Sequence, residues 1–118
     1  MNARRFIRSF GFAFAGIVQV FTEQNFRIHV LAAAVVIVAG VLTPISIVEW
    51  MILIIVMALV LGAEMLNSAI ERVVDIAMPD IHPIAKQAKD IAAGAVLVFA
   101  IASVIIGLLI FLPKWFLT

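Results

Sequence analysis

Hydrophobic residues along the chain fall into three long runs without charge, at residues 30–48, 50–63 and 91–113. The first run covers 19 residues and the third covers 23. A helix needs about 20 residues to cross a hydrocarbon core of about 30 Å. Apolar residues remain frequent after the second run, so the pattern predicts membrane-spanning helices over about residues 30–48, 50–70 and 91–113.

The stretch before these runs has a different pattern, because bulky apolar residues recur every three or four positions with basic residues between them. The apolar positions are Phe6, Phe10, Phe14, Ile17 and Phe21, and the basic ones are Arg4, Arg5 and Arg8. This spacing predicts an amphipathic helix over about residues 3–24 that lies on the membrane surface. The alternative is a membrane anchor that takes no part in catalysis.

Composition supports a membrane protein, with 66% hydrophobic and 13% charged residues. Ordinary soluble domains have about 25% charged residues. We therefore expect one all-α integral membrane domain over residues 1–118, with no nucleic acid among its partners. The chain has no cysteine, which excludes a thiolate metal site.

The basic residues predict the orientation of the chain. Seven of the eight lie before the first run or between the second and third, whereas the segment between the first two runs carries only Glu49. By the positive-inside rule, the N-terminus and the second loop are cytoplasmic and the C-terminus is outside. Small residues in the runs allow membrane helices to pack closely, so we expect a homo-oligomer.

A polar stripe follows the second uncharged run. On a helix, Glu64, Asn67, Ser68, Glu71 and Asp75 share one face. An ionisable group in the hydrocarbon layer costs about 2.5–3.5 kcal/mol and usually has a function. The deeper Glu64 suits proton abstraction and the shallower Glu71 suits a hydrated cation such as Mg²⁺. The alternative is that these groups only hydrogen-bond neighbouring spans.

Lys86, Lys89 and Asp90 form a second polar group, on one helical turn before the third run. Such lysines can bind phosphate. The alternative is that positive charge at a cytoplasmic helix end only sets the topology.

Two motifs resemble a known family. EMLNSAIERVVD (residues 64–75) and AKQAKDIAAGAVL (residues 85–97) are similar to the small bacterial lipid kinases, which comprise diacylglycerol kinases and undecaprenol kinases. The likeness extends to RRFIRSFGFAFAG (residues 4–16) and EQNFRIH (residues 23–29). It implies a homotrimer of three-span subunits in the bacterial cytoplasmic membrane that phosphorylates a lipid alcohol with MgATP.

The resemblance also implies roles for individual residues. Glu64 would be the general base, supported by Asn67, and Glu23 and Glu71 would bind Mg²⁺. The residues implied to contact the nucleotide are Lys89, Asp90, Asp80, Ile81, His82, Arg5 and Phe12, together with the metal ligands Glu23 and Glu71. Alignment of the N-terminal helix needs a one-residue gap, so Arg4 is the alternative to Arg5.

The same resemblance helps to choose between undecaprenol and diacylglycerol as the lipid substrate. Phe21 stands where the diacylglycerol-specific relatives carry tryptophan, and His29 where they carry glutamate. The chain is more similar to the undecaprenol kinases, so we expect undecaprenol as substrate, with diacylglycerol as the alternative. A remoter alternative is a non-enzymatic membrane subunit or transporter component whose buried Glu64 relays protons or holds helices together.

Overall fold

Four helices account for almost all of the computed structural model, which describes residues 2–117. They are α1 (Ala3–Val20), α2 (Gln24–Leu42), α3 (Ile47–Ala77) and α4 (Pro83–Phe116). Helix α1 is amphipathic, and the other three are long and apolar enough to cross a membrane. The described residues contain no strand. The prediction of an all-α membrane protein with an amphipathic N-terminal helix and three spans is confirmed.

The helices do not begin and end where the uncharged runs do. Helix α2 begins at Gln24, and α3 continues to Ala77. Backbone hydrogen bonding continues until local chemistry stops it. Ser46 and Glu49 form a reciprocal capping box at the start of α3, and Pro83 occupies the first turn of α4.

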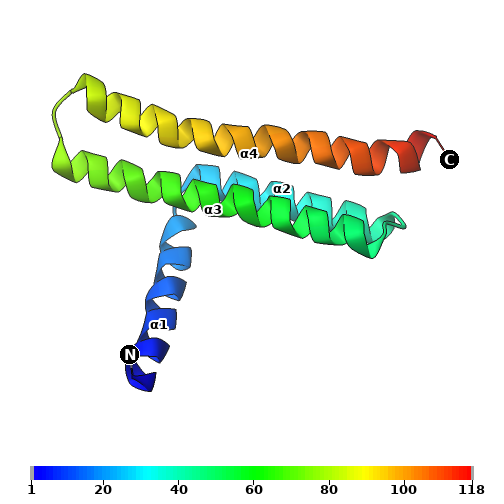
Figure 1. The fold of residues 1–118 in the computed structure, drawn as a ribbon, viewed down its shortest axis with the longest axis horizontal. Helices are drawn as coiled ribbons and strands as arrows, with labels where there is room; N and C mark the ends of the chain where they lie inside the picture. Colours follow the sequence, from blue (N-terminus) through cyan, green and yellow to red (C-terminus); the bar gives the residue numbers. More distant parts are fainter. Residues whose placement is uncertain (1, 118) are drawn as a thin grey trace.

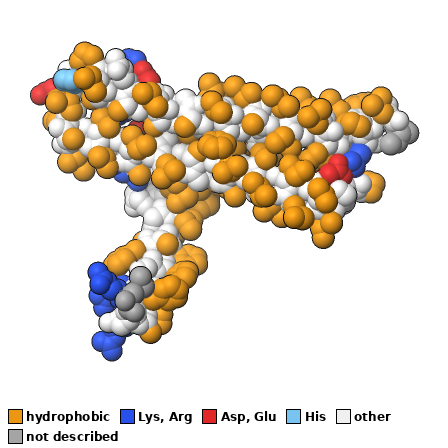
Figure 2. Space-filling view, in the orientation of Figure 1, with side chains coloured by type: hydrophobic (Ala, Val, Ile, Leu, Met, Phe, Trp, Pro, Cys, Tyr) orange, Lys and Arg blue, Asp and Glu red, His pale blue; other side chains and the backbone are white. Residues whose placement is uncertain are grey.

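Helices α2, α3 and α4 form a bundle, and α1 lies outside it. Helices α3 and α4 run antiparallel, with α2 beside α3, while α1 projects steeply away from them (Figure 1). The α3–α4 hairpin extends past the start of α2 at the end where residues 78–82 turn (Figure 1). Hydrophobic side chains cover most of the visible bundle surface, and Lys and Arg gather at the far end of α1 (Figure 2).

The end of the bundle opposite the α3–α4 turn is closed by side chains from all three helices. A core of Leu53, Ile110 and Phe111 lies there. Beyond it, Lys114 forms an ion pair with Glu49 at 2.6 Å. Trp115 Nε1 donates to Thr43 Oγ1 at 2.9 Å, and the Trp115 ring stacks on Phe111. These contacts fix how α4 sits on the α2–α3 turn.

Candidate active site

Polar side chains are buried on one face of α3, inside an otherwise apolar bundle. Glu64, Asn67 and Ser68 are exposed by only 4%, 5% and 2%. Polar groups buried in apolar surroundings cost free energy unless they have partners. The partners of these three side chains therefore define the site.

Glu23 connects this face to the start of α2. Its Oε1 accepts a hydrogen bond from the buried Ser68 hydroxyl and another from Arg72 Nη2 at 2.9 Å. The family resemblance implied that Glu23 acts together with Glu71 of this face, and the structure places Glu23 against Ser68 and Arg72 of α3. Both hydrogen bonds end on Oε1, so Oε2 is the oxygen left to bind a further ligand. Sequence reasoning missed Arg72, although its place one helical turn after Ser68 was a signal.

Asn67 and Glu71 contact one another on α3. Asn67 Nδ2 donates to Glu71 Oε1 at 3.3 Å. Asn67 Oδ1 is buried and has no hydrogen-bond partner in the part of the chain that the structure describes. An unsatisfied buried acceptor is uncommon in folded proteins and points to a ligand that brings a donor.

His29 of α2 faces Glu64. Its Nε2 lies 4.0 Å from Glu64 Oε2, and its side chain is 24% exposed. In the sequence, His29 served only to favour undecaprenol over diacylglycerol as substrate. Its place beside the predicted base Glu64 was not predicted. Its position five residues after Gln24 on α2 gave no signal, because the rotation of α2 against α3 is not encoded locally.

The second polar group lies near the α3–α4 turn, and its charges pair. Lys89 Nζ is 2.5 Å from Asp75 Oδ1, and Lys86 Nζ is 2.6 Å from Asp90 Oδ2. The Lys89 pair joins α4 to the polar stripe of α3, so the two predicted polar groups are continuous in space. All four side chains are more than a third exposed, which keeps them accessible to a soluble ligand.

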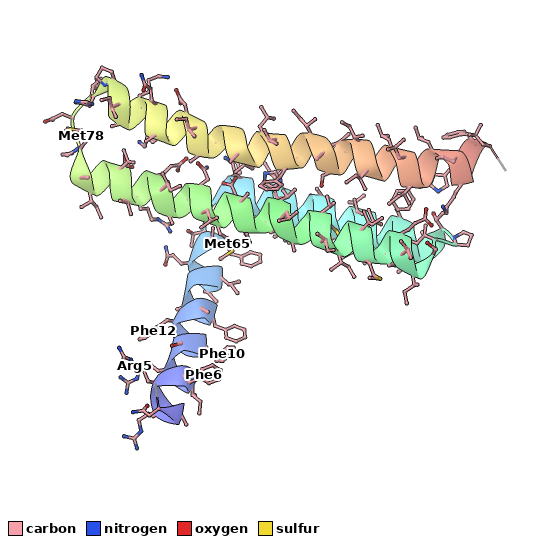
Figure 3. The ribbon with its side chains drawn as sticks, in the orientation of Figure 1. Arg5, Phe6, Phe10, Phe12, Met65 and Met78 are labelled. Carbon is pink, nitrogen blue, oxygen red and sulfur yellow. The ribbon has the colours of Figure 1, made fainter. Side chains whose placement is uncertain are left out.

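The remaining predicted residues lie in two places. Asp80, Ile81 and His82 form the exposed α3–α4 turn, where His82 Nδ1 caps α4 by accepting from the Ile84 N–H at 3.1 Å. Arg5 and Phe12 lie on the part of α1 that projects away from the bundle (Figure 3). The single chain therefore does not bring Arg5 and Phe12 to the polar face of α3.

An apolar groove of about 540 Å³ begins beside this site. Residues of α2 and α4 form its sides and residues of α3 form its floor. His29 and Ala100 line one end, and Trp115 lines the other. The groove therefore leads from the neighbourhood of Glu64 along the bundle.

Residues 11–111 match the family of prokaryotic diacylglycerol kinases. The chain belongs to that family. It is 51% identical to the undecaprenol kinase of Bacillus subtilis over 111 aligned residues. This alignment covers 93% of this chain and 90% of that protein. Its identity to a Synechocystis diacylglycerol kinase is 44%, over 89% of this chain and 61% of that protein. Its identity to the Pseudomonas aeruginosa diacylglycerol kinase is 38%, over 78% of this chain and 76% of that protein.

This family membership makes the chain a membrane-embedded lipid kinase, an enzyme that transfers a phosphoryl group from ATP. A polar site that starts in the bundle and continues to its exposed end agrees with that reaction, because one substrate is a lipid and the other is soluble.

The carboxylates of the site suit a metal ion that is bound mainly by the phosphates of the nucleotide. No group of three or more Asp, Glu, His or Cys side chains that could hold a metal occurs within residues 2–117. Mg²⁺ in kinases is usually bound by one or two carboxylates plus the substrate phosphates. Glu23 Oε2 and Glu71 can provide such carboxylate oxygens, since they lie on the same polar face through Ser68 and Asn67.

Proposed function

We propose that the chain transfers the γ-phosphoryl group of ATP to undecaprenol, forming undecaprenyl phosphate. The observation that carries this proposal is the buried Glu64 beside one end of an apolar groove. A long lipid alcohol can place its hydroxyl near Glu64 and its chain along the groove. The 51% identity to an undecaprenol kinase supports the choice of lipid.

On this proposal Glu64 is the general base. Its carboxylate takes the proton of the lipid hydroxyl while the hydroxyl oxygen bonds to the γ-phosphorus and the bond from the γ-phosphorus to the β,γ-bridging oxygen breaks. Phosphoryl transfer depends mainly on positioning and on neutralised charge. Asn67 supports the base, and its unpartnered Oδ1 is an acceptor for a hydroxyl or water in the site.

The nucleotide would bind at the exposed end of the polar face. Lys89 supplies positive charge to the phosphates, which requires it to exchange its contact with Asp75 for a phosphate oxygen. Asp90 and the turn of Asp80, Ile81 and His82 would complete the nucleotide site. Glu23 and Glu71 would hold Mg²⁺, whose role when bound is to neutralise charge on the phosphates.

Arg5 and Phe12 can contact the nucleotide only if α1 comes close to a nucleotide site. Both are labelled on the same side of α1, on the part of the helix that projects away from the bundle (Figure 3). We infer that they reach a nucleotide only in the homotrimer, or after α1 moves. The proposed orientation places the N-terminus and the α3–α4 turn in the cytoplasm of a bacterial cell, where ATP is available, and the C-terminus outside.

Diacylglycerol is the second candidate, because several relatives are named diacylglycerol kinases. The deciding experiment gives the purified protein equal amounts of undecaprenol and diacylglycerol in mixed micelles with labelled ATP, and then separates the two phosphorylated lipids. We expect undecaprenyl phosphate to carry most of the label. Label mainly in phosphatidic acid would reverse the choice of lipid, and a Glu64→Gln sample controls for contaminating kinases.

A further inference from the structure

His29 is the basic neighbour of the Glu64 carboxylate. The Glu64 side chain is only 5% exposed, and among the described residues His29 is the one cationic or potentially cationic side chain within 4.0 Å of it. The other bases near the site are engaged elsewhere, since Arg72 pairs with Glu23 and Lys89 pairs with Asp75. An ionised carboxylate in apolar surroundings is stable only with a donor or a counter-charge.

Asn67, on the same face of α3, offers a second donor to the Glu64 carboxylate. His29 is therefore the partner that another helix, α2, contributes to Glu64.

We propose that His29 is a positioning residue of the kinase reaction, which holds Glu64 Oε2 so that Oε1 faces the lipid hydroxyl at the end of the apolar groove. This inference rests on the proposed role of Glu64. The ring needs only to donate its Nε2–H, so the neutral imidazole suffices.

The distance between the two side chains agrees with a pair that tightens on substrate binding. At 4.0 Å, His29 Nε2 and Glu64 Oε2 are further apart than the about 2.7–3.2 Å of an N–H···O hydrogen bond. Catalytic hydrogen bonds are often long in empty sites and shorten in the complex. His29 also lines the groove, so a lipid chain there would press against the ring and limit its rotation.

The test separates a hydrogen-bond donor from bulk at position 29. His29→Leu removes the donor, and we expect kcat to fall about 10- to 100-fold, the effect of losing a hydrogen bond to a buried charge, with KM for MgATP unchanged. His29→Gln places an amide nitrogen near the position of Nε2, so we expect it to restore most of kcat. His29→Asn is too short for this and should resemble His29→Leu. Val30→Leu, on the next residue of α2, is the control for added apolar volume and should keep the parent kcat.

The comparison of Gln with Asn remains informative if His29→Leu fails to fold. Equal kcat in the two amide variants, or parent-like kcat in His29→Leu, would overturn the positioning role. Glu64→Gln is measured in parallel, because turnover that survives this change refutes the proposed base itself. An inactive Glu64→Gln together with an unaffected His29→Leu refutes only the role of His29.

Discussion

At the scale of residues, the three buried polar side chains of α3 have different partners. Ser68 donates to Glu23 across the helix junction, Glu64 faces His29, and Asn67 contacts Glu71 while its Oδ1 has no partner within the described residues. If these groups only joined helices, each would be expected to be fully hydrogen-bonded. The unpartnered Asn67 Oδ1 and the 4.0 Å separation of Glu64 from His29 favour a site that substrates complete.

Glu64→Gln tests the base directly. The amide has the shape of the carboxylate but accepts no proton, so we expect lipid phosphorylation to fall about 10²- to 10⁴-fold while the fold is kept. Turnover of the purified variant is measured with labelled ATP. Glu49→Gln is the matched control, because it makes the same change in α3 at the end of the bundle away from the site. Near-parent turnover in Glu64→Gln would exclude this residue as the base.

Glu71→Gln and Glu23→Gln test the metal ligands. Each substitution removes one negative charge from the metal site. Changing a residue that only supports a metal ligand already weakens metal affinity about 10- to 100-fold. We therefore expect the Mg²⁺ concentration for half-maximal activity to rise at least about tenfold. KM for the lipid should stay near that of the parent. Direct binding of Mn²⁺ in the presence of ATP, followed by electron paramagnetic resonance, gives a readout independent of turnover. Unchanged Mg²⁺ and Mn²⁺ titrations would remove both residues as ligands.

At the scale of elements, helix length explains how one site can serve a lipid and a nucleotide. Helix α3 has 31 residues and is therefore about 46 Å long, whereas a hydrocarbon core is about 30 Å thick. Helix α2, with 19 residues, is about 28 Å long. The polar face of α3 can thus begin at membrane depth with Glu64 and continue to Asp75 beyond the hydrocarbon.

Gly40 of α2 is a packing requirement of the bundle. A Cβ at this position would stand 2.5 Å from Trp50 Cη2, which forces the indole of α3 to shift. We expect Gly40→Ala to lower the free energy of unfolding by about 1–3 kcal/mol, the usual cost of overpacking. Thermal unfolding in detergent micelles measures the effect.

The control for Gly40→Ala is Gly94→Ala in α4, where a Cβ would meet nothing within 4 Å. This variant should unfold at or above the parent temperature, because alanine favours helix over glycine. Equal losses in both variants would mean that the contact with Trp50 does not limit packing.

At the scale of the whole molecule, the steep angle between α1 and the bundle matches a surface helix joined to spans (Figure 1). If α2, α3 and α4 cross the bilayer, α1 runs along its plane. The junction is fixed by the edge-to-face contact of Phe21 and Phe26 at 5.0 Å and by the bonds of Glu23 to α3. The site therefore lies at the level where the surface helix meets the bundle.

The proposed orientation can be measured by labelling single cysteines, because the chain has none of its own. We expect Pro44→Cys, in the α2–α3 turn, to react with a membrane-impermeant maleimide on intact cells after outer-membrane permeabilisation where one is present. Met78→Cys, in the α3–α4 turn, should react only after lysis. The reverse pattern would invert the topology and place the nucleotide site outside.

The proposed homotrimer is tested by the mass of the purified protein in detergent. Light scattering with the detergent contribution subtracted should give three chains of 12.8 kDa each. A stable monomer with full activity would contradict the trimer. It would also require Arg5 and Phe12 to act within one chain or not at all.

The helices and one face of the site could be predicted from the amino-acid sequence. Runs of apolar residues and the spacing of polar ones are local properties, so three spans, an amphipathic first helix and the α3 stripe from Glu64 to Asp75 could be predicted. Exact helix ends could not, because caps such as that of Ser46 decide them rather than the edge of the hydrocarbon.

Which side chains meet between helices depends on how the helices pack, and this could not be read from their local pattern. The contacts of His29 with Glu64, of Ser68 and Arg72 with Glu23, and of Lys89 with Asp75 join residues that are 14 to 49 positions apart. Each depends on the rotation and the axial position of one helix against another. Those are set by packing over the whole bundle, and no periodicity within a single helix encodes them.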